Sequence, residues 1–156
     1  EIQKGDCVCA GGEGPSAEIL CVVKTRIDSG VVRMVEMGCG LLITEYHPVR
    51  VNGVWRFPID VASGREVTEV DCIYSFVMKS GHVMVIGGVE CVGLGHHFCD
   101  NDVVAHPFFG SDEVVKCLMK MKGWERGMVV LNERPLVRSE ASQMVVGMRP
   151  ACEICV

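Results

Sequence analysis

The stretch Gly40-Leu41-Leu42-Ile43-Thr44-Glu45-Tyr46-His47-Pro48-Val49 is the part of the sequence on which the fold prediction depends. An apolar run ends at Thr44, and His47 follows three residues later. One interpretation is purely structural, because a β-branched threonine favours a strand and a polar residue before Pro48 suits a turn. The other interpretation is catalytic, and it depends on the segments on either side of this stretch.

Short apolar segments separated by turn residues surround this stretch. Asn52-Gly53 is the strongest turn signal, since both residues tolerate the positive φ angles of a type I′ hairpin. Ser80-Gly81 is expected to join a second hairpin, and Gly87-Gly88 a further turn. Short strands at this spacing predict an all-β domain. The predicted strands are 17–23, 31–37, 41–44, 49–51, 54–57, 72–78, 82–86 and 89–92.

The sequence changes character after Gly95 and predicts a C-terminal extension that contains one helix. Ser111 can cap a helix over residues 111–122, which has acidic residues in its first turn and apolar residues at helical spacing. Two late strands are expected at 127–131 and 143–148. The predicted division is therefore a β core at 1–95, an extension at 96–150 and a tail at 151–156.

Composition limits the classes of function that the chain can have. Its 156 residues fit one domain, and a hydrophobic content of 49% is sufficient for a core. A net charge of −5 with no basic run argues against nucleic-acid binding. No apolar stretch approaches the roughly 20 residues that a membrane span requires. No signal peptide is recognisable, so a cytoplasmic location is expected.

The ten cysteines do not have the density of a disulfide scaffold. Cys21, Cys72 and Cys91 lie within predicted strands, where a free thiol packs as a small hydrophobe. Without a secretory signal, reduced thiols are expected. Cys152-Glu153-Ile154-Cys155 is only half of a zinc or redox motif, and the preferred interpretation is a frayed tail or a cut into the next segment.

Three segments in a fixed order resemble the Hint (hedgehog/intein) module, which cleaves its own backbone. They are Ile2-Gln3-Lys4-Gly5-Asp6-Cys7-Val8, the segment from Thr44 to His47, and the segment from Cys72 to Val92. The strings at 47–53, 88–96 and 100–110 are similar to the Vint subgroup, the Hint-like domain of von Willebrand factor A proteins. The resemblance covers nearly the whole chain, and it implies a Hint-like all-β fold.

The resemblance implies an intramolecular, cysteine-dependent cleavage of the chain's own upstream polypeptide. A thiol attacks the carbonyl of the preceding residue in an N-to-S acyl shift, and water or another small nucleophile releases the thioester. Proton transfer falls to His47, and Thr44 supports the reacting carbonyl or the histidine. His82 is assigned an assisting role, with an exposed residue after a turn as the alternative. No cofactor and no metal are implied.

Two departures from the family pattern limit the expected activity. Where splicing inteins end in His-Asn, this chain has Val92-Gly93 and continues to residue 156, so full splicing is not expected. The block that begins with the nucleophilic cysteine is missing before Glu1. The chain is therefore expected to be a segment of a longer protein and inactive by itself. Cys7 and Cys9 are expected to be core or loop thiols rather than replacements for that cysteine.

A dense polar group has three interpretations. It can be a hydrogen-bonded linker, a pocket that regulates the active site, or a zinc site, although its spacing fits no standard zinc signature. The group consists of His96, His97, Cys99, Asp100 and His106.

The alternative to self-cleavage for the whole domain is a non-catalytic interaction module. Wider proteins of the resembled family often carry ubiquitin-related modules, so the resemblance implies ubiquitin-pathway proteins as further partners. A structural zinc protein is the weaker third alternative. A cysteine upstream of Glu1 would favour cleavage over the interaction module, and elemental analysis would test the zinc alternative.

Overall fold

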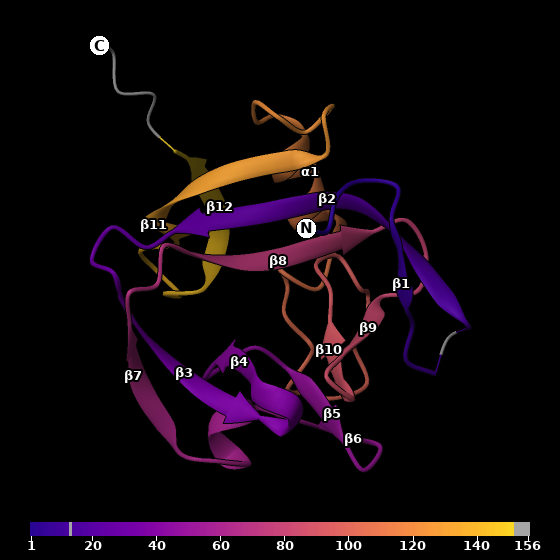
Figure 1. The fold of residues 1–156 in the computed structure, drawn as a ribbon. Coiled ribbons are helices and arrows are strands. Elements are labelled where there is room, and N and C mark those ends of the chain that lie inside the picture. Colours follow the sequence, from indigo (N-terminus) through magenta and orange to yellow (C-terminus); the bar gives the residue numbers. More distant parts are fainter. Residues whose placement is uncertain (13, 152–156) are drawn as a thin grey trace.

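Strand β2 (Ser16–Arg26) organises the largest sheet of the computed structural model, which describes residues 1–12 and 14–151. This eleven-residue strand, the long indigo arrow of Figure 1, has three partners. It pairs in parallel with β11 and antiparallel with β1 and β8. The fifth strand of the sheet, β12, pairs with β11. The other members of this sheet are β1 (Cys7–Cys9), β8 (Cys72–Met78), β11 (Met128–Arg138) and β12 (Val145–Pro150).

Two smaller sheets lie on one side of the β2–β8 pair (Figure 1). The first has the order β6-β5-β10-β9 and the second the order β4-β3-β7. Short 3-10 turns occur at Gly38–Gly40 and Pro58–Asp60. The strands are β3 (Val31–Met37), β4 (Leu41–Thr44), β5 (Val49–Val51), β6 (Val54–Arg56), β7 (Gly64–Thr68), β9 (Val83–Ile86) and β10 (Val89–Val92).

The core consists of two clusters on opposite faces of β2. Ile19 belongs to the cluster shared with the smaller sheets, whereas Cys21 belongs to the cluster covered by the helix. Residues two apart normally share a face of a strand, but the β2–β8 register shifts between Ile19 and Cys21. This irregularity lets one strand supply apolar side chains to both clusters.

The helix α1 (Asp112–Met119) forms where Ser111 indicates a helix start. The Ser111 hydroxyl accepts a hydrogen bond from the Glu113 N–H at 3.3 Å, and Val114 and Leu118 are buried against the large sheet. The helix is shorter than the range 111–122 because the chain turns back toward β11. The Met128 N–H donates to the Gly123 carbonyl at 3.0 Å, and Gly123 has a positive φ of 99°.

The predicted all-β fold with one helix in its C-terminal part is confirmed. The Asn52-Gly53 hairpin is present, and both residues have positive φ, 51° and 78°, as a type I′ turn requires. The prediction of a hairpin between 72–78 and 82–86 is wrong. β8 pairs with β2 and β9 with β10, because the long β2 offers β8 a ladder over almost its whole length.

One strand of the structure was not predicted, and one predicted feature lies outside the described residues. β7 was not predicted, because Arg65 and Glu66 give it no apolar alternation. The Cys152–Cys155 motif lies outside the described residues. Among the residues that the structure describes, no helix is long and apolar enough to cross a membrane.

Candidate active site

His47 is positioned by the turn that joins β4 to β5. The backbone N–H of His47 donates to the carbonyl of Thr44 at 3.1 Å, which closes the turn. Tyr46, within the turn, is 69% exposed, and Pro48 leads the chain directly into β5. The three-residue spacing noted in the sequence therefore links Thr44 and His47 through the backbone.

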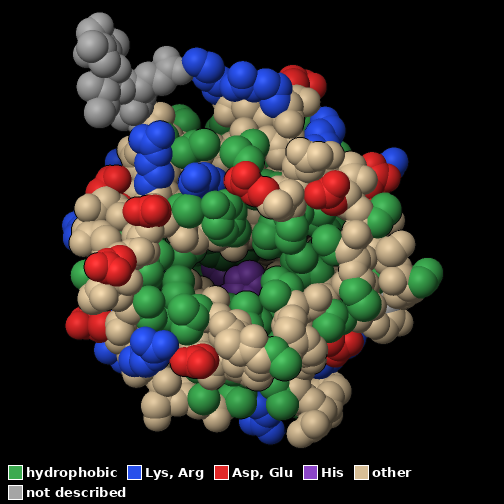
Figure 2. All heavy atoms as spheres, viewed as in Figure 1, with side chains coloured by type: hydrophobic (Ala, Val, Ile, Leu, Met, Phe, Trp, Pro, Cys, Tyr) green, Lys and Arg blue, Asp and Glu red, His purple; other side chains and the backbone are tan. Residues whose placement is uncertain are grey.

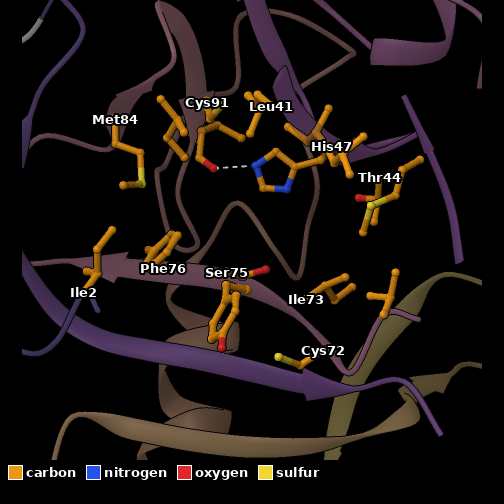
Figure 3. Close-up of a pocket in the computed structure, with 17 residues that line it drawn as sticks. Ile2, Leu41, Thr44, His47, Cys72, Ile73, Ser75, Phe76, Met84 and Cys91 are labelled. Atoms are coloured by element: carbon orange, nitrogen blue, oxygen red, sulfur yellow. Dashed lines mark hydrogen bonds between the residues drawn. The ribbon is translucent and has the colours of Figure 1, made fainter. Parts of the chain in front are cut away.

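The imidazole ring of His47 is held by the carbonyl of Val92. Pairing of Cys91 in β10 with Val49 in β5 brings the end of β10 beside the histidine. The His47 Nε2 atom lies 2.9 Å from the Val92 oxygen (Figure 3). A carbonyl oxygen can only accept, so Nε2 carries the hydrogen in this bond. In the neutral ring Nδ1 is then the basic nitrogen.

The environment keeps this ring neutral at pH 7. Burial lowers the pKa of His47 from its ordinary 6.5, and the hydrogen bond to the Val92 carbonyl opposes that effect more weakly. A neutral imidazole with a fixed tautomer can take a proton at Nδ1 and return it to a leaving group. The geometry therefore suits His47 to proton transfer.

A cavity of about 430 Å³ opens beside the His47 ring, and Thr44 lines it as well. Figure 2 shows this face as a hollow with mostly hydrophobic walls and a histidine at its base. The structure thus brings together the two residues that the sequence predicted as a pair. The apolar part of the lining includes Ile2, Met34, Leu41, Leu42, Ile43, Ile73, Phe76, Met84 and Ile86.

Four of the described cysteines, two in the cavity lining and two on β1, are poorly placed to act as the attacking thiol. Cys91 lines the cavity, but burial raises its pKa to about 11, so it stays a protonated thiol at neutral pH. Cys72 lines the cavity within β8, where pairing with Arg26 of β2 fixes its backbone. Cys7 and Cys9 are exposed on β1, so their assignment to the core or a loop was wrong.

The side chain of His82 is not part of the cavity lining. Its ring centroid lies 6.1 Å from that of His97 and 6.4 Å from that of Phe98. The backbone of His82 is closer to the site, since its carbonyl accepts a 2.7 Å hydrogen bond from the N–H of Gly93, the residue after Val92. His82 therefore supports the position of the Val92 carbonyl through its main chain.

The histidines of the polar group after Gly95 bond mainly to backbone amides. Nδ1 of buried His96 accepts from the Phe98 N–H at 3.0 Å, and Nδ1 of His106 accepts from two backbone N–H groups. His97 reaches Asp112 at 3.1 Å. Within the described ranges, no group of three or more His, Cys, Asp or Glu side chains is arranged to hold a metal ion. These contacts favour the interpretation as a hydrogen-bonded linker.

Two site components were missed in the sequence. The Val92 carbonyl is a backbone group, so no side-chain pattern announces it. Ser75 lines the cavity from β8, and its position inside an apolar strand pattern was the only available signal. Both become visible only when the sheets are placed relative to each other.

These features define an all-β domain with a neutral histidine at the base of an apolar cavity. The Vint family model, described as a Hint-domain, matches residues 1–147, and the chain belongs to this family. The predicted Hint-like fold is confirmed by this match, and Hint domains are modules of the autoprocessing type. No curated protein matches the chain.

Proposed function

We propose that the domain cleaves its own upstream polypeptide by an N-to-S acyl shift followed by hydrolysis of the thioester. The observation that carries this proposal is the His47 ring, fixed by the Val92 carbonyl at the base of an open cavity that Thr44 shares. Such a ring is placed to move the proton that backbone cleavage requires. The family match supports the same class of reaction.

Two strand edges border the cavity, and we infer that it is a slot for one extended strand. Residues Leu41–Thr44 of β4 and Cys72–Phe76 of β8 line it without a gap. Side chains alternate between the faces of a strand, so an unbroken run of lining residues means that the strand edge faces the cavity. Among the described residues, β4 pairs with β3 alone, and the Cys72–Ser75 part of β8 with β2 alone.

The N-terminal residues lead toward this slot. Ile2 lines the cavity, and the Gly5 N–H donates to the Ile19 carbonyl of β2 at 2.8 Å, which anchors the segment. Residues upstream of Glu1 in the longer chain would therefore begin at the mouth of the cavity. An extended segment that enters between the two open edges would gain backbone hydrogen bonds, as in strand addition.

The proposed chemistry conserves atoms and protons. The thiol of a cysteine upstream of Glu1 gives its proton to Nδ1 of His47, and the sulfur attacks the carbonyl carbon of the preceding residue. The C–S bond forms, the C–N bond breaks, and the proton passes from His47 to the leaving nitrogen. Water then attacks the thioester, which forms a carboxylic acid and restores the thiol. Thr44 helps to fix His47 or donates to the reacting carbonyl.

The upstream position of the nucleophile and the absence of splicing are both part of this proposal. The four cysteines discussed above are either exposed on β1 or held within paired strands. After Val92-Gly93 the chain continues into α1 and β11, which pairs with β2 in parallel. A C-terminal release at Gly93 would separate these paired strands, so release of the upstream segment alone fits the fold better.

The experiment that tests the proposal uses the longer natural chain, which includes the residues upstream of Glu1. Purified protein is incubated at pH 7, and products are followed by gel electrophoresis and intact-mass measurement. We expect two products and loss of cleavage when one upstream cysteine is changed to alanine. The chain Glu1–Val156 should stay intact. Cleavage that persists after removal of every upstream cysteine would refute the proposal.

Hydrogen exchange tests the strand slot separately from the chemistry. The Phe76 carbonyl bonds outward to Leu94, and residues two apart direct their backbone groups to the same edge, so the Tyr74 N–H faces the cavity. We expect its exchange to be at least about tenfold slower in a cleavage-blocked longer chain than in Glu1–Val156. The Val129 amide, in paired β11, is the internal control. Equal exchange at Tyr74 in both chains would exclude strand insertion at this edge.

A further inference from the structure

Ser75 places a hydroxyl on the wall of the cavity formed by β8. The close-up shows this hydroxyl on the side of the cavity opposite the His47 ring (Figure 3). Thr44, on the edge of β4, supplies the other hydroxyl of an aliphatic side chain in the lining. The two facing strand edges therefore each carry one alcohol in surroundings that are mainly apolar.

The Ser75 hydroxyl is available to form a hydrogen bond with a segment that occupies the slot. Within the part of the chain that the structure describes, it makes no hydrogen bond to another protein group. A strand that fills the cavity would shield this hydroxyl from water. A shielded hydroxyl without a partner is destabilising, so we expect the inserted segment to supply one. A segment in the slot offers backbone carbonyl oxygens near Ser75.

The geometry of an amide indicates which oxygen this is. In a planar amide the oxygen and the nitrogen lie on different sides of the carbonyl carbon. If the leaving nitrogen faces Nδ1 of His47 on one wall, the oxygen of the same group is directed toward the wall that carries Ser75. Negative charge develops on this oxygen as the thiol attacks, and a fixed donor there stabilises the transition state more than the ground state.

We propose that Ser75 is a further catalytic residue, whose hydroxyl donates a hydrogen bond to the oxygen of the scissile carbonyl. This inference rests on the proposed function, because it assigns a group to the same reaction. Ser75 forms no covalent bond in either step and keeps its proton. It acts in the acyl shift and again in thioester hydrolysis, since both steps pass through a tetrahedral oxyanion.

Rate measurements on four variants of the longer chain test this role. The pair Ser75→Thr and Ser75→Val has nearly the same shape and differs in the hydroxyl. Ser75→Ala removes the hydroxyl without adding bulk, and Ser80→Ala is a matched serine control at an exposed turn residue. Cleavage is followed with and without dithiothreitol, which releases the thioester independently of water, and thermal unfolding of each variant checks its fold.

We expect Ser75→Ala and Ser75→Val to slow both the thiol-induced and the hydrolytic cleavage by about 10²-fold. The cleavage rate of Ser75→Thr should remain within about tenfold of the wild-type rate, and Ser80→Ala should cleave at the wild-type rate. If Ser75→Ala cleaves within about threefold of the wild type, or if Thr and Val are equally slow, the hydroxyl has no such role. If an alanine variant does not fold, the Thr and Val pair decides. Failure of the wild-type chain to cleave would instead refute the proposed function.

Discussion

Replacement of His47 by alanine in the longer chain is expected to slow its cleavage by about 10²–10⁴-fold, the usual contribution of a positioned acid–base group. The reason is the fixed ring, whose Nε2 is bonded to the Val92 carbonyl at 2.9 Å while Nδ1 faces the cavity. The rate is measured by densitometry of the precursor and product bands. Thermal unfolding of the same samples separates loss of chemistry from loss of fold.

Two other histidines serve as controls for this substitution. His97, an exposed residue that pairs with Asp112, is not part of the cavity, so His97→Ala should cleave at the wild-type rate. The ring of His82 lies against His97 and Phe98, so the geometry predicts little change in His82→Ala. A loss in His82→Ala as large as that in His47→Ala would support the catalytic assignment made from the sequence.

The pH dependence of cleavage follows from the state of His47. Burial lowers its pKa below 6.5, so the ring is neutral and able to accept a proton at pH 7. The rate should therefore fall as the pH decreases through this lowered value. The same fall in rate at low pH in the slow His47→Ala variant would show that another group controls the pH dependence.

Acidification from pH 7 to pH 4 is expected to reduce the free energy of unfolding by about 3 kcal/mol through His96 alone. Burial is the main cause that lowers the pKa of His96 from 6.5 to about 4, and the neighbouring histidines add to it. In this interval the unfolded chain binds more protons than the folded chain. The stabilisation is therefore complete above pH 6.5 and is lost as the pH falls toward 4.

Urea unfolding of the wild type and of His96→Gln at several pH values measures this contribution. Glutamine keeps an acceptor for the Phe98 N–H but does not titrate. We expect the loss of stability between pH 7 and pH 4 to shrink by about 3 kcal/mol in the variant. His47 and His106, whose pKa values are also lowered by burial, leave a remaining dependence of the same sign. An unchanged pH dependence in His96→Gln would contradict the assignment.

Local pattern predicted the strands of this domain well and their partners less well. The predicted strands at 31–37 and 41–44 coincide with β3 and β4, because both are apolar runs, with Gly30 and Gly38 on either side of the first and Gly40 before the second. β8 pairs with β2, which is distant in the sequence, and not with the next strand, β9. Local sequence patterns carry no information about such a long-range partner. The irregularity that turns Ile19 and Cys21 toward different clusters is likewise a product of pairing.

The same distinction applies to the site. Thr44 and His47 could be predicted because their link is local, a hydrogen bond within one turn. The cavity, the Val92 carbonyl and Ser75 come together where three sheets meet. They could therefore not be predicted from local sequence. The von Willebrand factor A association, ubiquitin-pathway partners and cytoplasmic location stay predictions of the family resemblance, as does the division at residues 95 and 96.

Trapping of the thioester tests the central claim most directly. The longer chain is incubated with hydroxylamine at pH 7, and the released upstream fragment is analysed by mass spectrometry. The account predicts a fragment that ends in a hydroxamate at the residue before a cysteine upstream of Glu1, and at least about 10²-fold slower formation of this fragment in His47→Ala. An uncleaved wild-type chain, or formation of the hydroxamate fragment at the wild-type rate in the His47→Ala variant, would contradict it.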